Sequence, residues 1–188
     1  MISAELEKIF QLLYSRARSQ HYEFISLEHL LLVMIEKDDD VRSVLENCHA
    51  DLKLLSQQLE ESIAENTPKI PDHLLDTAET QPTLGFQRVI QRAMVHTQSA
   101  GKSAVAPLDV LVALMGETDS HAVYFLKLQS VTRYEILRCI AHGAGFSEQS
   151  DSDGPNQDDE GNIENKGDAL ADYTVNLNAE VKAGRIDP

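Results

Sequence analysis

The sequence lacks the segments that would carry a protein into or across a membrane. Its apolar residues never run for the roughly 18–20 positions that span a bilayer. A secretory signal has a basic stretch followed by an apolar one. The N-terminus, MISAELEKIF, lacks this pattern and has acidic residues early. These absences predict a cytoplasmic protein with no membrane partner.

Cysteine is almost absent as well. Cys48 and Cys139 are the only two, and each follows an apolar helical pattern. Two isolated cysteines are typical of reduced thiols in the cytosol, so a structural disulfide is not expected. A thiol on an apolar helix face is unreactive, and His49 is only a sequence neighbour of Cys48, which is not the geometry of a base and a nucleophile. No catalytic residue is predicted.

Positive charge is scarce: 16 lysines and arginines stand against 31 acidic residues, for a net charge of −15. Nine of the acidic residues fall within residues 147–172, which contain one lysine and almost no bulky apolar side chain. Such a segment cannot bury enough surface to offset its ordering entropy, so it is predicted to be a flexible acidic linker. An acidic surface repels phosphate backbones, and nucleic acid is therefore not an expected partner.

Sustained alternation of β-branched residues is missing, so strands are not expected. Up to residue 146, apolar residues such as Leu6, Ile9 and Leu13 instead recur at intervals of three and four, which places them on one face of a helix. The predicted fold class is all-α with eight helices. Their limits are marked by N-caps at Ser3, Ser26, Asp51 and Thr83, a capping box of Thr132 with Glu135, Pro107 in a first turn, and ends at Gly101, Gly116 and Gly143.

The helical residues up to 146 contain an internal repeat, in which similar residues recur at a fixed distance along the sequence. Four-helix repeats are predicted at residues 1–65 and 83–143, joined by a loop at 66–82, and together they form one domain at 1–146 with pseudo-twofold symmetry. Arg16 and Arg92 are equivalent in the two repeats, and each is expected to pair with an acid of the opposite half. The offset is 76 for Phe10-Gln11 with Phe86-Gln87 and for Arg16-Ala17 with Arg92-Ala93, then 81 from Leu27-Glu28 with Leu108-Asp109 onward.

Three stretches resemble the N-terminal domain of ClpA-type unfoldases, the ATP-driven partners of Clp proteases. They are HYEFISLEHLLLVMIE from residue 21, TQPTLGFQRVIQRAMVHTQSAGKS from residue 80 and the closing IAHG at 140–143. Residues 173–188, YTVNLNAEVKAGRIDP, resemble the truncated start of the first ATPase module of that family. The related ClpC and ClpB N-domains share the double repeat and remain an alternative, as does a free-standing helical scaffold.

The resemblance implies a non-catalytic docking domain without a cofactor of its own. ATP and magnesium are expected only in the ATPase modules that would follow. The implied partners are a ClpS-type adaptor that delivers N-end-rule substrates, other protein substrates, and the ClpP protease through the full-length protein. Implied adaptor contacts are Glu23, Glu28, Thr83, Arg88 and Arg133.

Several of these residues could instead have a purely structural role within their own helix. Glu23 and Glu28 lie near a helix N-terminus, where the helix dipole favours acids, and Thr83 is an N-cap residue type. Arg133 is harder to explain locally, because a basic residue in a first turn is mildly unfavourable. An arginine fork suits carboxylates on a partner.

Two other patterns suggest chemistry and are rejected. His21, Glu23, Glu28 and His29 could form the zinc site of a small hydrolase, but their spacing is not H-E-x-x-H and His29 points elsewhere around its helix, so no metal site is predicted. Residues 101–103 read Gly-Lys-Ser without the glycine five positions earlier, and they end a helix instead of opening one. Phosphate binding is not expected there.

Overall fold

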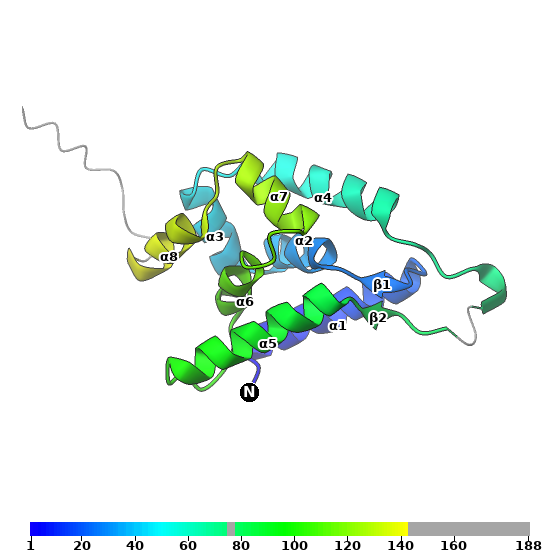
Figure 1. Cartoon of the computed structure of the whole chain (residues 1–188), viewed down its shortest axis with the longest axis horizontal. Coiled ribbons are helices and arrows are strands. Elements are labelled where there is room, and N and C mark those ends of the chain that lie inside the picture. Colours follow the sequence, from blue (N-terminus) through cyan, green and yellow to red (C-terminus); the bar gives the residue numbers. More distant parts are fainter. Residues whose placement is uncertain (75–77, 143–188) are drawn as a thin grey trace, which may run out of the picture. The chain divides into compact units, whose positions relative to one another are not determined.

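Two sets of four helices follow one another, as the repeat predicts. The computed structural model describes residues 1–74 and 78–142. The predicted linker at 147–172, the ATPase lead-in at 173–188 and the helix end at Gly143 lie outside these residues. The all-α fold with eight helices is confirmed in the described part of the chain (Figure 1): α1 Ala4–Ser19, α2 Leu27–Lys37, α3 Asp39–Asn47, α4 Leu52–Asn66, α5 Leu84–Ser99, α6 Pro107–Leu114, α7 His121–Leu128 and α8 Arg133–His142.

The expectation of no strands is wrong at one place. Strands β1, Phe24–Ile25, and β2, Gln81–Pro82, pair in parallel. The Gln81 N–H donates to the Glu23 carbonyl, and the Thr83 N–H donates to the Ile25 carbonyl, each at 2.9 Å. Strands of two residues are too short to leave an alternating pattern in the sequence. Between α4 and β2 the chain also forms a single 3₁₀ turn, η1 Asp72–Leu74.

The helix limits follow the predicted caps. The capping box of α8 is confirmed: the Thr132 N–H donates to the Glu135 carboxylate at 3.0 Å, and the Glu135 N–H donates to the Thr132 hydroxyl at 3.2 Å. Just after α5, Gly101 takes the left-handed conformation with φ +68° that favours glycine. Pro107 opens α6 as expected. The side chains of Ser3, Asp51 and Thr83 accept the N–H groups of Leu6, Leu54 and Phe86.

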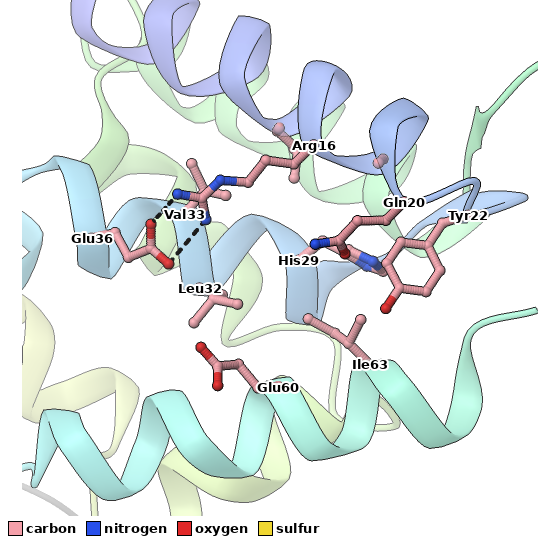
Figure 2. Close-up of a pocket in the computed structure, with 11 residues that line it drawn as sticks. Arg16, Gln20, Tyr22, His29, Leu32, Val33, Glu36, Glu60 and Ile63 are labelled. Atoms are coloured by element: carbon pink, nitrogen blue, oxygen red, sulfur yellow. Dashed lines mark hydrogen bonds and ion pairs between the residues drawn. The ribbon is translucent and has the colours of Figure 1, made fainter. Parts of the chain in front are cut away.

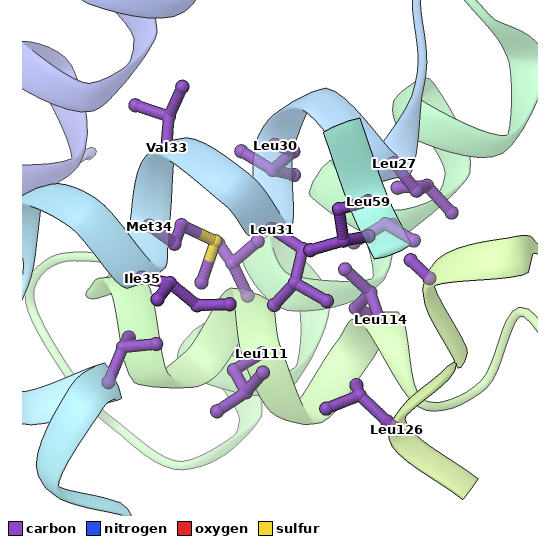
Figure 3. Close-up of a cluster of buried hydrophobic side chains, with 14 of the residues drawn as sticks. Leu27, Leu30, Leu31, Val33, Met34, Ile35, Leu59, Leu111, Leu114 and Leu126 are labelled. Atoms are coloured by element: carbon purple, nitrogen blue, oxygen red, sulfur yellow. The ribbon is translucent and has the colours of Figure 1, made fainter. Parts of the chain in front are cut away.

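The two halves pack through matching pairs of helices. α2 contacts α7 just as α3 contacts α6, and α4 contacts α7 just as α3 contacts α8. Phe10 and Phe86, which are equivalent in the two repeats, contact each other with ring centroids 5.9 Å apart. A contact between equivalent residues is expected at a pseudo-twofold axis. Figure 3 shows part of the shared core, which contains Leu30, Leu31 and Met34 of α2 together with Leu111 and Leu114 of α6.

Each half contains an equivalent ion pair, from the first helix to an acid at the end of the second helix in one half and just beyond it in the other. Arg16 donates to both carboxylate oxygens of Glu36, at 2.9 and 2.5 Å. Arg92 donates to Glu117 at 2.8 Å and to the Ala113 carbonyl at 2.9 Å. Glu36 and Glu117 differ by the repeat offset of 81. The expectation that each arginine pairs with the opposite half is therefore wrong, because each arginine reaches an acid of its own repeat, Glu36 in α2 and Glu117 just after α6.

A cavity of about 260 Å³ lies between α1, α2 and α4, and the buried His29 lines it (Figure 2). The His29 Nδ1 accepts the Ser26 N–H at 3.3 Å and lies 2.9 Å from the Ser26 hydroxyl. His29 therefore fills the place that Glu or Gln takes in a capping box. Its side chain packs edge-on against Tyr22, with ring centroids 5.0 Å apart. Burial lowers the pKa of His29 to about 4, so the ring is neutral at pH 7.

The buried His29 should make the fold acid-sensitive. Its folded pKa lies below the unfolded value, so its contribution to stability is complete above about pH 6.5 and is lost as the pH falls toward 4. The full difference is about 3 kcal/mol, because one pKa unit is worth about 1.4 kcal/mol. We expect the free energy of unfolding to fall by about 2–3 kcal/mol more in the wild type than in His29→Gln between pH 7 and 4.

Urea unfolding at a series of pH values measures this difference. His29→Gln keeps an acceptor for the Ser26 N–H but does not titrate, so the comparison of slopes removes any constant cost of the substitution. Parallel pH profiles for the two proteins would show that His29 is not kept neutral by the fold.

Candidate functional site

Glu23 and Thr83 are brought together by the short β1–β2 pairing. Glu23 leads into β1, where its N–H donates to the Pro68 carbonyl and its carbonyl accepts from Gln81, each at 2.9 Å. Its side chain is exposed. Thr83 follows β2, and its hydroxyl accepts the Phe86 N–H at 3.3 Å as the N-cap of α5. The backbone ladder therefore holds both residues beside the start of α5.

Arg88 lies further along the first turns of α5 and is held in place while remaining exposed. Its Nε–H and Nη2–H donate to one oxygen of Glu117 at 3.2 and 2.6 Å, and Arg92 takes the other oxygen. The Arg88 side chain is 62% exposed, whereas that of Glu117 is 11% exposed. Hydrogen bonding from Arg88, followed by that from Arg92, holds the pKa of the Glu117 carboxyl below its usual value.

This arrangement leaves Arg88 able to bind a partner. The Nη1 group donates no hydrogen bond within residues 1–74 and 78–142, and the side chain as a whole is 62% exposed. Because Glu117 already orients the guanidinium, less side-chain conformational entropy would be lost when a partner carboxylate binds to it. We call Glu23, Thr83 and Arg88 the β-edge surface.

Glu28 has a different environment from these three residues. Its side chain is buried, with the residue only 9% exposed, and its Oε1 accepts the backbone N–H of Ala122 at 3.1 Å. Ala122 lies in the first turn of α7, in the second repeat. The carboxylate therefore satisfies a helix N-terminus across the repeat boundary, where the dipole of α7 favours it. Glu28 does lie in the first turn of its own helix α2, as the sequence predicts, but the hydrogen bond of its carboxylate to the start of α7 was not anticipated.

Arg133 lies apart from the β-edge surface. It is the exposed first residue of α8, which packs against α3 and α6. In Figure 1, α8 lies at one end of the long axis and the β1–β2 pair lies toward the other end. The structure thus places Glu23 and Thr83 at the β1–β2 pairing and Arg88 in the helix that follows, buries the carboxylate of Glu28 and places Arg133 on α8.

A shallow groove beside β1 was missed by the sequence reasoning, which treated residues 66–82 only as a connection. Phe24 is 36% exposed along this groove, which encloses about 640 Å³. Glu23 and Glu79 contribute carboxylates to its wall. The apolar residues within the predicted loop were the available signal. Also lining the groove are Ile70, Pro71, Leu74, Ala78 and Gln81.

The structure describes the surroundings of the residues in both rejected patterns. Within the part of the chain that the structure describes, no three His, Cys, Asp or Glu side chains come together to hold a metal ion. Lys102, in the Gly-Lys-Ser stretch, donates to Asp109 at 2.7 Å.

Of the helices in the described residues, none is both long and apolar enough to cross a bilayer.

Comparison with known proteins places the chain in a family. Residues 1–129 match the Clp repeat (R) N-terminal domain. The chain is 35% identical to the ClpA homolog protein of Fuscovulum blasticum, over 99% of this chain and 24% of that protein. It thus spans about a quarter of the length of this curated relative.

Solved structures show the same fold at low sequence identity. The N-terminal domain of Candida albicans Hsp104 superposes with a TM-score of 0.62 at 16% identity, over 76% of this chain and 92% of that one. A ClpV N-domain solved in complex with a VipB peptide superposes with a TM-score of 0.57 at 16% identity, over 74% and 84%. The duplicated helical fold and the match over residues 1–129 agree, and the chain belongs to the Clp repeat N-terminal domain family.

Proposed function

We propose that this chain is the docking domain of a ClpA-type unfoldase, which binds a ClpS-type adaptor and protein substrates in the cytoplasm for delivery to ClpP. The domain itself carries out no catalysis and holds no cofactor, and ATP is hydrolysed elsewhere in the full-length protein. The observation that carries the proposal is the 35% identity to a ClpA homolog over 99% of the chain. The more distant structures support the fold alone.

The β-edge surface supports the docking role through its chemistry. It presents an acid at Glu23, a hydroxyl at Thr83 and an oriented guanidinium at Arg88. A complementary partner would place a carboxylate against Arg88 and a basic group against Glu23. The exposed ring of Phe24 adds apolar area beside them, and aromatic side chains and arginines are the residue types that most often dominate binding energy at interfaces.

Arg133 and Glu28 have different roles in this proposal. Arg133 forms a second patch, which an adaptor reaches only if it extends along the domain toward α8. Glu28 acts from inside, because its hydrogen bond to Ala122 fixes the start of α7 relative to α2. Its effect on binding is then indirect.

A second candidate function is the direct capture of peptides, as an N-domain of another Clp type. The ClpV N-domain has been solved with a VipB peptide, and the groove beside β1 offers this chain a recess with apolar walls and acidic edges. Competition separates the two functions: an adaptor bound to the β-edge surface should exclude a peptide from the groove, since Glu23 belongs to both.

Removal of the Arg88 guanidinium should weaken adaptor binding. Arg88→Ala is expected to cost roughly 1–3 kcal/mol, or about 5- to 150-fold in Kd, if Arg88 is a central contact. Calorimetric titration with a ClpS-type adaptor measures the change. Lys53→Ala is the matched control, because it removes one exposed positive charge from α4, away from the β-edge surface. Equal affinities for the two variants would place the adaptor elsewhere.

Arg133→Ala tests the second patch in the same titration. A loss of roughly 1–3 kcal/mol is expected if the adaptor also contacts α8. The same exposed Lys53→Ala variant serves as control. Wild-type affinity in Arg133→Ala would restrict the adaptor to the end of the domain that carries β1 and β2.

Truncation of Glu28 should destabilise the fold. Glu28→Ala leaves the buried Ala122 N–H without an acceptor, which costs about 1–3 kcal/mol in the free energy of unfolding. Glu28→Gln keeps an acceptor oxygen and should lose less. Urea unfolding of both variants measures the difference, while adaptor titration of the stable Glu28→Gln variant tests direct contact. Reduced affinity without reduced stability would contradict an internal role.

A further inference from the structure

The only two cysteines of the chain meet at the boundary between the repeats. Cys48 is the C-terminal cap of α3, and Cys139 lies on α8. They are 91 positions apart in the sequence, yet their Sγ atoms are 3.7 Å apart. Both are free thiols. The two sulfurs are thus in van der Waals contact, on helices that pack against each other.

Internal duplication does not account for this pairing. With the offset of 81 that applies in this part of the repeat, the position equivalent to Cys48 is Gln129 and the position equivalent to Cys139 is Gln58. The cysteines therefore occur at unrelated positions, and only the packing of α3 on α8 brings them together. Neither takes part in the β-edge surface.

The two thiols differ in access. Cys48 is only 8% exposed and belongs to the hydrophobic core, whereas Cys139 is partly exposed at the edge of that core. Helix α8 also carries Glu135 and Arg138, which lie close enough to Cys48 to shift the pKa of its thiol. The charge of Glu135 raises this pKa and that of Arg138 lowers it. An oxidant from solution would reach the Cys139 sulfur first and find the Cys48 sulfur directly behind it.

We propose that Cys48 and Cys139 form a reversible dithiol–disulfide site that joins the two repeats and reacts with small disulfides such as oxidised glutathione. The Cys139 thiolate attacks one sulfur of the oxidant, which breaks the S–S bond and releases one glutathione thiolate. Cys48 then loses its proton to water and attacks the Cys139 sulfur. A second glutathione thiolate leaves, so two protein thiols lose two electrons in total and one oxidised glutathione becomes two reduced ones.

Two opposing effects determine the rate of the second step, in which Cys48 attacks the Cys139 sulfur. Burial, the largest cause, raises the pKa of Cys48 above its usual value, so only a small fraction of molecules carries the Cys48 thiolate near neutral pH. The attack is intramolecular, however, and well-oriented intramolecular reactions reach effective concentrations of about 10⁵ M or more. Proximity is therefore large enough to offset the scarcity of thiolate, and the disulfide can form despite burial.

The new bond would connect the first repeat to the last helix of the second. Such a cross-link closes a chain loop of 91 residues and restricts the unfolded state. We expect the midpoint of thermal unfolding to rise by roughly 5–10 °C when the site is oxidised. A reductant should return it to the starting value.

Mass spectrometry of the full 188-residue chain tests the proposal. The reduced protein is incubated with oxidised glutathione, and remaining thiols are blocked with an alkylating agent. The expected product is a monomer that has lost two hydrogens, resists alkylation and yields a Cys48–Cys139 cross-linked peptide. Dithiothreitol should restore two alkylatable thiols and the original unfolding midpoint.

Single substitutions separate the two steps. Cys48→Ser should stop at a glutathione adduct on Cys139, because no second thiol is left to displace it. Cys139→Ser should react far more slowly, since only the buried thiol remains. A wild type that accumulates the adduct, stays fully reduced or forms disulfide-linked dimers would overturn the proposal. Equal reactivity of the two variants would overturn the assigned order of attack.

Discussion

Burial of α2 is the constraint on which the rest of the structure depends. This helix is apolar on most of its faces, and it contacts α1, α3 and α4 of its own repeat as well as α6 and α7 of the other. A helix that is apolar all round must be covered on every side. Each fully buried leucine such as Leu30 or Leu31 contributes about 1.5–3 kcal/mol. Neither half could cover α2 alone, so the repeats fold as one unit.

The position of α2 also determines which polar groups face the solvent. Its start is fixed by β1 on one side and by the core on the other, and this turns the Glu28 carboxylate inward to the α7 N-terminus. Glu23, five residues earlier, lies outside the covered helix and remains exposed. Two acids that are close in sequence thus acquire different roles, one in cohesion between the repeats and one on the proposed docking surface.

The two repeats share a scaffold but differ in the surface they present. Both contain an equivalent ion pair, as Arg16 with Glu36 in α2 and as Arg92 with Glu117 just after α6. Only the second repeat adds Arg88 to that carboxylate. In the first repeat the ion pair only joins parts of the fold, whereas in the second repeat the same carboxylate also orients the exposed guanidinium of Arg88. A duplicated fold can in this way carry a docking surface in one repeat only.

The sequence by itself determined the helices, their caps and the repeat, because these depend on interactions within a few residues or on a constant offset. Thr83, Gly101 and the Thr132–Glu135 box could be assigned in this way. The tertiary structure alone decided the inward turn of Glu28, the separation of Arg133 from β1 and β2, and the meeting of Cys48 with Cys139. Each of these depends on how α7 and α8 pack on the first repeat, and local pattern carries no information about that packing.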